Sequence, residues 1–200
     1  MRPPRRYKES PSQTAGPYVH IGCTPNFVGV QGIYSADLGA GPDADLGCAL
    51  QGADVPGERI TIAGQICDGA GELITDAMVE SWQADAQGRY PTAGASFSGW
   101  ARQACDLTTG VFTFRTIKPG CIQTSGGPQS PHISIWIVAR GINLGLHTRI
   151  YFADEDNSAD PVLAAIDPMR RQTLIASQRG DAYVFNVRLQ GENETVFFDL

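Results

Sequence analysis

The sequence predicts an all-β fold, a β-sandwich, and three observations support that prediction. From Ile60 onward, short segments of alternating apolar and polar residues recur, as in strands that have one buried face. Glycine and proline, 23 and 13 of the 200 residues, separate these segments and are typical of turns. Hydrophobic residues make up 42% of the chain, which is enough to bury one core, so we expect a single domain overall.

The N-terminal part, residues 1–57, lacks a sustained period of either the helical or the strand kind. Turn-forming residues occur at 39–43 and at Pro56-Gly57. We interpret residues 1–57 as an extended N-terminal arm and irregular segment that packs on a partner chain. Residues 58–200 then form the β-sandwich domain.

The domain is expected to open with a hairpin. Ile60, Ile62 and Ile66 alternate along its first strand, residues 68–71 read Asp-Gly-Ala-Gly and form a turn, and its second strand covers 77–82.

A second hairpin-like unit is centred on the turn at 108–110. This turn leads into a strand at 111–117, which Pro119 ends because proline has no N–H to donate to a sheet. Further strands are expected at 148–152, 183–189 and 195–198. The expected total is therefore seven or more strands, at the spacing of a sandwich.

The clearest strand begins at His132. Ile133, Ile135 and Ile137 alternate and define a buried face, so His132 and Ser134 point to the opposite face. Two histidines spaced in this way would present half of a metal site on one face of a strand. Here the second histidine position is serine.

Residues 160–177 interrupt the strand pattern. Two Asp-Pro pairs, at 160–161 and 167–168, place an N-cap aspartate before a proline at the first helical position. We therefore expect a short helical insertion near 160–177, made of two short helices.

Charge and cysteine content exclude several classes of protein. The net charge is −6, from 15 basic and 21 acidic residues without a basic stripe, which disfavours a nucleic-acid partner. The five cysteines are odd in number, irregularly spaced and lack a Cys-x-x-Cys pair, which argues against a disulfide framework and a zinc site. Arg5-Arg6 precedes polar residues and not an apolar core, and no apolar run approaches membrane-spanning length. We expect a cytoplasmic protein with no membrane partner.

Three motifs, at 79–90, 114–120 and 131–133, together resemble the intradiol ring-cleaving dioxygenases. They read Val-Glu-Ser-Trp-Gln-Ala-Asp-Ala-Gln-Gly-Arg-Tyr, Phe-Arg-Thr-Ile-Lys-Pro-Gly and Pro-His-Ile, and they occur in the order and at the spacing of that family. Residues 11–18 and 191–199 extend the resemblance to the alpha-type subunits of its two-chain members and over nearly the whole chain. The resemblance implies non-haem ferric iron held by two tyrosinates and two histidines, which activates a catechol as a Lewis acid.

Carried onto this sequence, the four ligand positions fall at Tyr90, Ile122, His132 and Ser134. Isoleucine has no donor atom and a neutral serine hydroxyl is a poor substitute for imidazole, so we expect a vestigial site that holds no metal. The arginine that catalytic relatives carry three residues before the first histidine is replaced by Gln129. The resemblance therefore implies no catalytic residue on this chain, which we expect to be inactive alone.

What the resemblance implies is a division of labour in a hetero-oligomer. A homologous beta subunit holds the Fe(III), and this chain completes the substrate pocket across the interface. The complex then cleaves protocatechuate, a carboxylated catechol, with O2. The substrate-binding residues would be Thr14, Gly16 and Pro17 in the arm, and Arg140, whose guanidinium suits the substrate carboxylate.

Plainer alternatives stand beside these assignments. His132 and Tyr90 can form a polar pair in a filled cavity, Arg140 can be a surface or subunit-bridging charge, and the arm can serve assembly alone. At the level of function, the strand pattern also fits a transthyretin-like binding sandwich, a class that does no chemistry. An iron-binding homo-oligomer is a further alternative, which Ile122 and Ser134 oppose.

Overall fold

The computed structural model describes residues 15, 16, 18–31, 41–48 and 54–199. In these residues it contains short helices and eleven strands. The strands are β1 (Arg59–Cys67), β2 (Met78–Gln83), β3 (Trp100–Ala104), β4 (Val111–Ile117), β5 (Ile122–Thr124), β6 (Gly127–Gln129), β7 (His132–Val138), β8 (Leu146–Phe152), β9 (Ile175–Arg179), β10 (Ala182–Val184) and β11 (Val187–Arg188).

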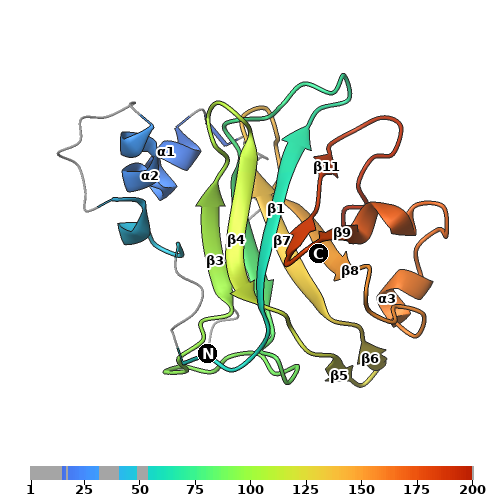
Figure 1. Ribbon diagram of the computed structural model, residues 1–200. Coiled ribbons are helices and arrows are strands. Elements are labelled where there is room, and N and C mark those ends of the chain that lie inside the picture. Colours follow the sequence, from blue (N-terminus) through green and yellow to red (C-terminus); the bar gives the residue numbers. More distant parts are fainter. Residues whose placement is uncertain (1–14, 17, 32–40, 49–53, 200) are drawn as a thin grey trace, which may run out of the picture.

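The strands form two packed layers, which confirms the predicted β-sandwich (Figure 1). In one layer β1 pairs with β4, β10 and β11, and in the other the order is β3-β2-β7-β8. Strand β9 pairs with β10 through its second half and with β8 through its first residues, so it joins the layers into one hydrogen-bonded path. Side chains from both layers, including Ile62, Phe112, Ile135 and Ile150, are buried between them and form the core.

Strand β7 has the register that the sequence predicts. Ile133, Ile135 and Ile137 are at most 2% exposed and face the core. Ser134 and Trp136 lie on the other face and are partly exposed, whereas His132 on that face is buried. The face that was expected to carry half a metal site is therefore the outer face of this layer.

Both predicted hairpins are wrong as strand pairs, although their turns exist. At the first turn, Cys67 and Leu73 form a short bridge, but β1 then pairs with β4 while β2 pairs with β3 and β7. At the second turn the chain passes from β3 to β4, which also belong to different layers. Turn residues indicate that the chain reverses, but burial of the apolar faces decides which layer the next strand joins.

The predicted strand at 195–198 is also wrong. Only Phe198 makes a bridge, to His147, while Thr195 N donates to Arg188 O and Val196 N donates to the Thr173 hydroxyl. These backbone groups bond to three different segments, so no ladder forms. The expected strand at 183–189 is split into β10 and β11, yet its alternate apolar side chains Tyr183, Phe185 and Val187 are buried as predicted.

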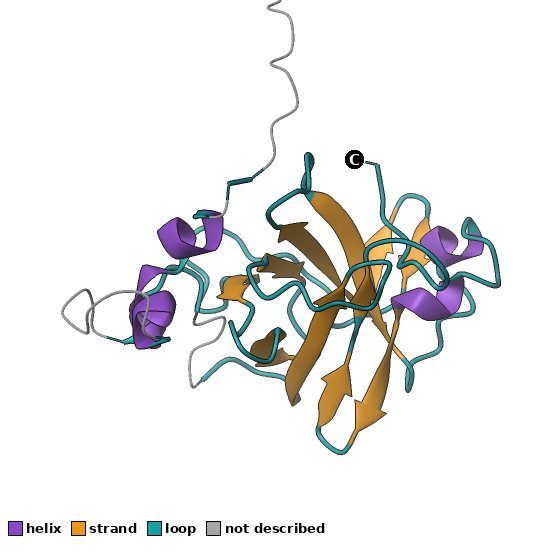
Figure 2. Cartoon of the chain, turned by 90° about the horizontal axis from the view of Figure 1, so that it is seen from above, coloured by secondary structure: helices purple, strands orange, loops and turns teal. Residues whose placement is uncertain are grey.

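The helical insertion is present as α3 (Pro161–Ala164) and the 3-10 helix η3 (Arg171–Leu174). The Asp160 carboxylate caps α3, accepting from Val162 N at 2.8 Å and Leu163 N at 2.9 Å, as the Asp-Pro pair predicts. Asp167 instead heads a turn, and η3 begins four residues later. Figure 2 shows this insertion and the N-terminal helices at opposite ends of the sandwich.

The N-terminal segment differs from the expected irregular chain. It contains α1 (Val19–Cys23), α2 (Pro25–Val30) and the 3-10 helix η2 (Pro42–Ala44), which lie beside β3 (Figure 1). The Asp45 carboxylate accepts from the backbone N–H groups of Asn26 and Phe27 and so fixes the start of α2. Packing of the arm on a partner, and the boundary at residue 57, stay predictions. Among the described helices, each is too short or too polar to cross a membrane.

Candidate functional site: a degenerate metal position

A row of side chains crosses the outer face of the second layer at the position of the missing histidine. Trp82 on β2 stands opposite Ser134 on β7, and Ser134 stands opposite Arg149 on β8. Directly opposed residues in antiparallel strands point to the same side of the sheet, about 5 Å apart at their β-carbons. Trp82, Ser134 and Arg149 therefore lie on one face, away from the core.

Tyr90 reaches this row from a loop. Its ring stacks on Trp82 with 5.8 Å between ring centroids and 7° between the ring planes. The loop has its shape because Gly88 adopts a φ of 75°, and a β-carbon there would collide with the Cys121 carbonyl oxygen. Gly120 N also donates to Asp85 O at 2.9 Å, so the Tyr90 loop is held against the segment that leads into Ile122.

His132 is 1% exposed, and a hydrogen bond fixes the orientation of its ring. Its Nδ1 lies 2.8 Å from the Ser130 carbonyl oxygen, which requires Nδ1 to carry the proton. Its Nε2 is buried without a hydrogen-bond partner in the described structure. Burial lowers the pKa of His132 to about 4, and the charge of Arg149 adds to that effect, so the ring is neutral at pH 7.

Arg149 connects the site. Its Nη1 donates to the Gln129 side-chain oxygen at 3.1 Å and to the Tyr151 hydroxyl at 3.3 Å, and its guanidinium lies 5.8 Å from the Phe198 ring centroid. Burial raises the pKa of Tyr90, and the positive charge of Arg149 opposes part of that rise. One guanidinium thus acts on both surviving ligand-type residues.

Tyr151 links the site to the helical insertion. Its ring lies 5.5 Å from that of His132, and its hydroxyl donates to Asp160 at 3.3 Å. Burial raises the pKa of Tyr151 to about 12, so the phenol is neutral. The second Asp160 oxygen accepts from Ser130 N at 2.8 Å, next to the carbonyl that orients His132. The cap of α3 therefore also supports the histidine.

The donor atoms do not fit ferric iron. Ile122 is buried and apolar, and Ser134 offers only a neutral hydroxyl, which leaves Tyr90 and His132 as the oxygen and nitrogen donors of the ligand pattern. Among the described residues, no group of three or more His, Cys, Asp or Glu side chains is placed to hold a metal ion. A tyrosine and a neutral imidazole alone make too small a set for a tightly bound trivalent cation.

The predicted substrate-binding residues lie elsewhere. Arg140 is eight residues beyond His132, about 25 Å away for extended chain, past the far end of β7. Its backbone bridges to Ala15, so the arm runs beside it, and its Nε lies 3.2 Å from an Asp76 carboxylate oxygen. Gly16 follows in the chain, and a β-carbon on it would contact nothing. Thr14 and Pro17 lie outside the described residues.

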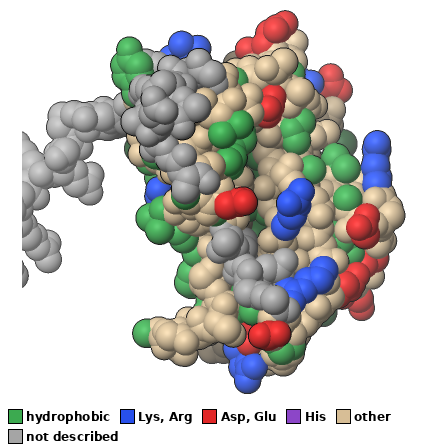
Figure 3. All heavy atoms as spheres, turned by 60° about the vertical axis from the view of Figure 1, so that its left-hand side comes forward, with side chains coloured by type: hydrophobic (Ala, Val, Ile, Leu, Met, Phe, Trp, Pro, Cys, Tyr) green, Lys and Arg blue, Asp and Glu red, His purple; other side chains and the backbone are tan. Residues whose placement is uncertain are grey.

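The structure therefore brings Arg140 and Ala15 together, at the opposite end of β7 from His132. Arg140 is 67% exposed at its side chain, which leaves the guanidinium open to a ligand or partner. Basic and acidic side chains are interspersed on the face shown in Figure 3, so this face is not a basic surface that would attract anions by its overall charge.

Arg149, Tyr151 and Asp76 are the residues that sequence reasoning missed. Alternation along the predicted strand 148–152 places Arg149 and Tyr151 on one face, so the sequence could have shown that these two side chains lie together. Their pairing with Ser134 and His132 was not readable, because it depends on the register between β7 and β8.

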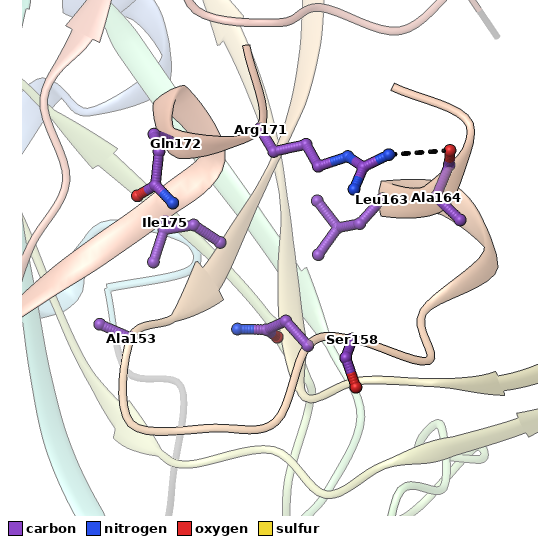
Figure 4. A pocket seen from close by; sticks show the side chains of 8 residues that line it. Ala153, Ser158, Leu163, Ala164, Arg171, Gln172 and Ile175 are labelled. Carbon is purple, nitrogen blue, oxygen red and sulfur yellow. Dashed lines mark hydrogen bonds between the residues drawn. The ribbon is translucent and has the colours of Figure 1, made fainter. Parts of the chain in front are cut away.

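A cavity of about 360 Å³ lies on the side of the helical insertion (Figure 4). Leu163, Ala164, Gln172 and Ile175 help to line it, and Arg171 donates to the Ala164 carbonyl at 3.1 Å. The arginine charge is thus used to bind the end of α3. None of the predicted site residues lines this cavity.

Known proteins that are similar to this chain are dioxygenases. A family model described as "Dioxygenase" matches residues 32–191. The chain is 45% identical over 202 residues to the protocatechuate 3,4-dioxygenase alpha chain of Pseudomonas putida, with 96% of each chain covered. It is 29% identical over 167 residues to the protocatechuate 3,4-dioxygenase beta chain of Burkholderia cepacia, covering 74% of this chain and 71% of that one. Among solved structures, the dioxygenase domain of a carbohydrate-binding fusion protein from Streptomyces sp. SirexAA-E matches with a TM-score of 0.55 and 25% identity, over 74% of this chain and 88% of that chain.

Proposed function

The chain belongs to the intradiol dioxygenase family, and we propose that it is the alpha subunit of a protocatechuate 3,4-dioxygenase. Its similarity to an alpha chain over 96% of both sequences supports this assignment over a transthyretin-like binding sandwich. The enzyme is an oxidoreductase of aromatic catabolism, in the beta-ketoadipate pathway. It breaks the ring bond between the two hydroxylated carbons of protocatechuate, and both atoms of O2 enter the product, 3-carboxy-cis,cis-muconate.

The single observation that carries the division of labour is the degenerate metal position. The apolar side chain of Ile122 and the neutral hydroxyl of Ser134, which stands opposite Arg149, support a chain that binds no ferric iron itself. We therefore assign the Fe(III) to a homologous beta subunit, where it would supply Lewis-acid activation of the two catechol oxygens. Similarity to a beta chain at lower identity supports a hetero-oligomer of two related chains.

The contribution of this chain to the substrate pocket comes from the arm side. The Nε of Arg140 lies 3.2 Å from an Asp76 carboxylate oxygen, which helps to orient the guanidinium, and the side chain is 67% exposed. A planar guanidinium suits the carboxylate of protocatechuate, which catechol lacks. Gly16 and the flanking Thr14 and Pro17 would border the partner's site with backbone and small side chains. This arrangement binds and orients substrate and moves no proton.

The proposed compartment is the cytoplasm. An odd number of cysteines with irregular spacing supports a reducing environment.

The deciding experiment is to measure iron content and protocatechuate cleavage for the chain expressed alone and co-expressed with the beta chain from the same source. We expect colourless, inactive protein alone and coloured, active protein when the two co-purify. Iron and cleavage activity in the lone chain would overturn the assignment. A chain that neither binds the beta chain nor affects its activity would favour the carrier-type alternative.

A further inference from the structure

Three positions at which this chain departs from the ferric pattern, Ile122, Gln129 and Ser134, converge on one side chain, that of Arg149. Ile122 stands opposite Gln129 in the β5–β6 pair, Gln129 accepts a hydrogen bond from Arg149, and Arg149 stands opposite Ser134 in the β7–β8 pair. We propose that the Arg149 guanidinium replaces the lost metal: it supplies the positive charge of the degenerate site and keeps metal cations out of it. The inference rests on the proposed function, because it concerns the metal site of that family.

The small side chain of Ser134 makes room for this arrangement. Opposed residues have β-carbons about 5 Å apart, so the side chains at 134 and 149 share one space on the outer face. Serine occupies little of it, and the guanidinium passes to Gln129 at 3.1 Å and Tyr151 at 3.3 Å. An imidazole at 134 would meet the Arg149 side chain before it met a metal.

Gln129 provides a neutral acceptor for the Arg149 guanidinium. Its neutral side-chain oxygen accepts from Arg149, whereas an arginine at 129, as the catalytic relatives carry, would set two guanidinium groups side by side. The positive charge of this region is therefore carried by Arg149, and the amide oxygen of Gln129 accepts a hydrogen bond from it.

Tyr90 and His132, the two remaining ligand-type residues, lie near the positive charge of Arg149. Arg149 is close enough to affect the pKa of both Tyr90 and His132, and a metal bound between them would face that guanidinium. The Nδ1 of His132 is held by the Ser130 carbonyl oxygen, so the ring keeps a fixed orientation beside this charge. Restoring the two missing ligands would leave this repulsion in place.

The test restores the ligands with and without Arg149, in the complex co-expressed with the beta chain. The double variant I122Y/S134H should keep the iron content of the wild-type complex, because the guanidinium still excludes the cation. The triple variant I122Y/S134H/R149Q should double the iron per alpha–beta pair and add tyrosinate-to-iron charge-transfer absorption. Iron is measured by elemental analysis after gel filtration, so no activity is needed.

Two matched variants separate charge from other causes. I122Y/S134H/R149K keeps a positive charge and should stay at the wild-type iron content. I122Y/S134H/R115Q removes an exposed arginine from β4 in the other layer and should also behave as the double variant. Equal iron in the double and the R149Q triple variants, or an assembled R149Q triple variant without extra iron, would overturn the inference.

A second contrast needs fewer changes and guards against a triple variant that does not assemble. S134H/R149Q offers Tyr90 and two histidines, and should bind added cobalt(II), seen by its visible absorption, at least tenfold more tightly than S134H alone. Equal cobalt affinity would contradict the exclusion by Arg149. A wild-type complex without iron and without protocatechuate cleavage would instead reject the proposed function. The comparison of cobalt affinity between S134H/R149Q and S134H requires neither iron nor cleavage activity, so the two failures can be told apart.

Discussion

At the scale of single residues, the site is organised by charge and burial more than by donor atoms. His132 keeps a ligand-like orientation through its Nδ1 bond to the Ser130 carbonyl, yet it faces an arginine. Arg140, beyond the other end of β7, is exposed, and its Nε forms an ion pair with the Asp76 carboxylate. Arg149 thus lies beside the proposed degenerate metal position, whereas the exposed Arg140 is the proposed contact to substrate or partner.

The buried histidine predicts a dependence of stability on pH. Burial lowers the pKa of His132 from 6.5 to about 4 in the folded chain, so between these pH values the unfolded chain binds more protons. The stability contribution is full above about 6.5, falls as the pH falls toward 4, and amounts to roughly 3 kcal/mol at most. Urea unfolding at pH 7 and pH 4.5 should show a smaller difference for His132→Asn than for wild type. An unchanged difference would mean that other groups dominate.

The substrate role of Arg140 predicts a kinetic effect. Arg140→Ala removes a charge-assisted contact to the protocatechuate carboxylate, so the KM should rise about tenfold while iron content stays unchanged. Steady-state kinetics of the co-expressed complex measure it. Arg179→Ala, an exposed arginine on β9, is the control and should leave the KM unaltered. A wild-type KM in Arg140→Ala would restrict that residue to assembly or to the surface.

At the scale of elements, short segments are held by polar anchors. Asp160, which is 0% exposed, caps α3 and also receives bonds from Ser130 N and the Tyr151 hydroxyl. Lys118, the residue after β4, has its Nζ 2.6 Å from a carboxylate oxygen of Asp154 and 2.6 Å from one of Glu155. These contacts join the helical insertion and the β8 end to the sheet, and a helix of four residues has too few bonds of its own to persist without them.

The Asp160 anchor predicts a large loss of stability. Asp160→Ala removes the cap and leaves buried N–H and O–H groups unpaired, so the free energy of unfolding should fall by about 2–4 kcal/mol. Denaturant unfolding followed by tryptophan fluorescence measures it. Asp167→Ala, at the exposed turn before η3, is the matched control and should change stability by about 0.5 kcal/mol or less. Equal effects of the two substitutions would contradict the anchoring role of Asp160.

At the scale of the whole molecule, the two site regions lie at opposite ends of β7. Residues near His132 belong to the degenerate metal position, whereas Arg140, Asp76 and Ala15 form the arm side. The proposed contact to the partner's site would therefore come from the arm side, and the proposed degenerate metal position lies on the outer face of the sheet near the other end of β7.

This separation predicts additivity. Because no hydrogen bond or ion pair of the described residues joins His132 and Arg140 to a common partner, and the chain between them spans up to about 25 Å, the effects of His132→Asn and Arg140→Ala should add within about 0.5 kcal/mol. A double-mutant cycle on unfolding free energy and on the KM of the complex measures the coupling. A coupling energy above about 1 kcal/mol would show that β7 transmits strain between its ends.

The sequence by itself determined the local features of this protein. Alternation along 132–138 set which side chains of β7 face the core, and the Asp-Pro pair at 160–161 set the start of α3. Ile122 and Ser134 in the sequence predict a metal site without its full set of donors. These features depend on backbone geometry and on the chemistry of single side chains, which neighbouring residues are enough to specify.

Only the tertiary structure decided how distant segments meet. It placed β1 and β2 in different layers, set Arg149 opposite Ser134, and brought Ala15 beside Arg140. Strand pairing and register are fixed by burying apolar faces between segments far apart in the chain, and a local pattern is compatible with several such pairings. The arginine at the former metal position is therefore a property of the fold that the motif residues alone do not contain.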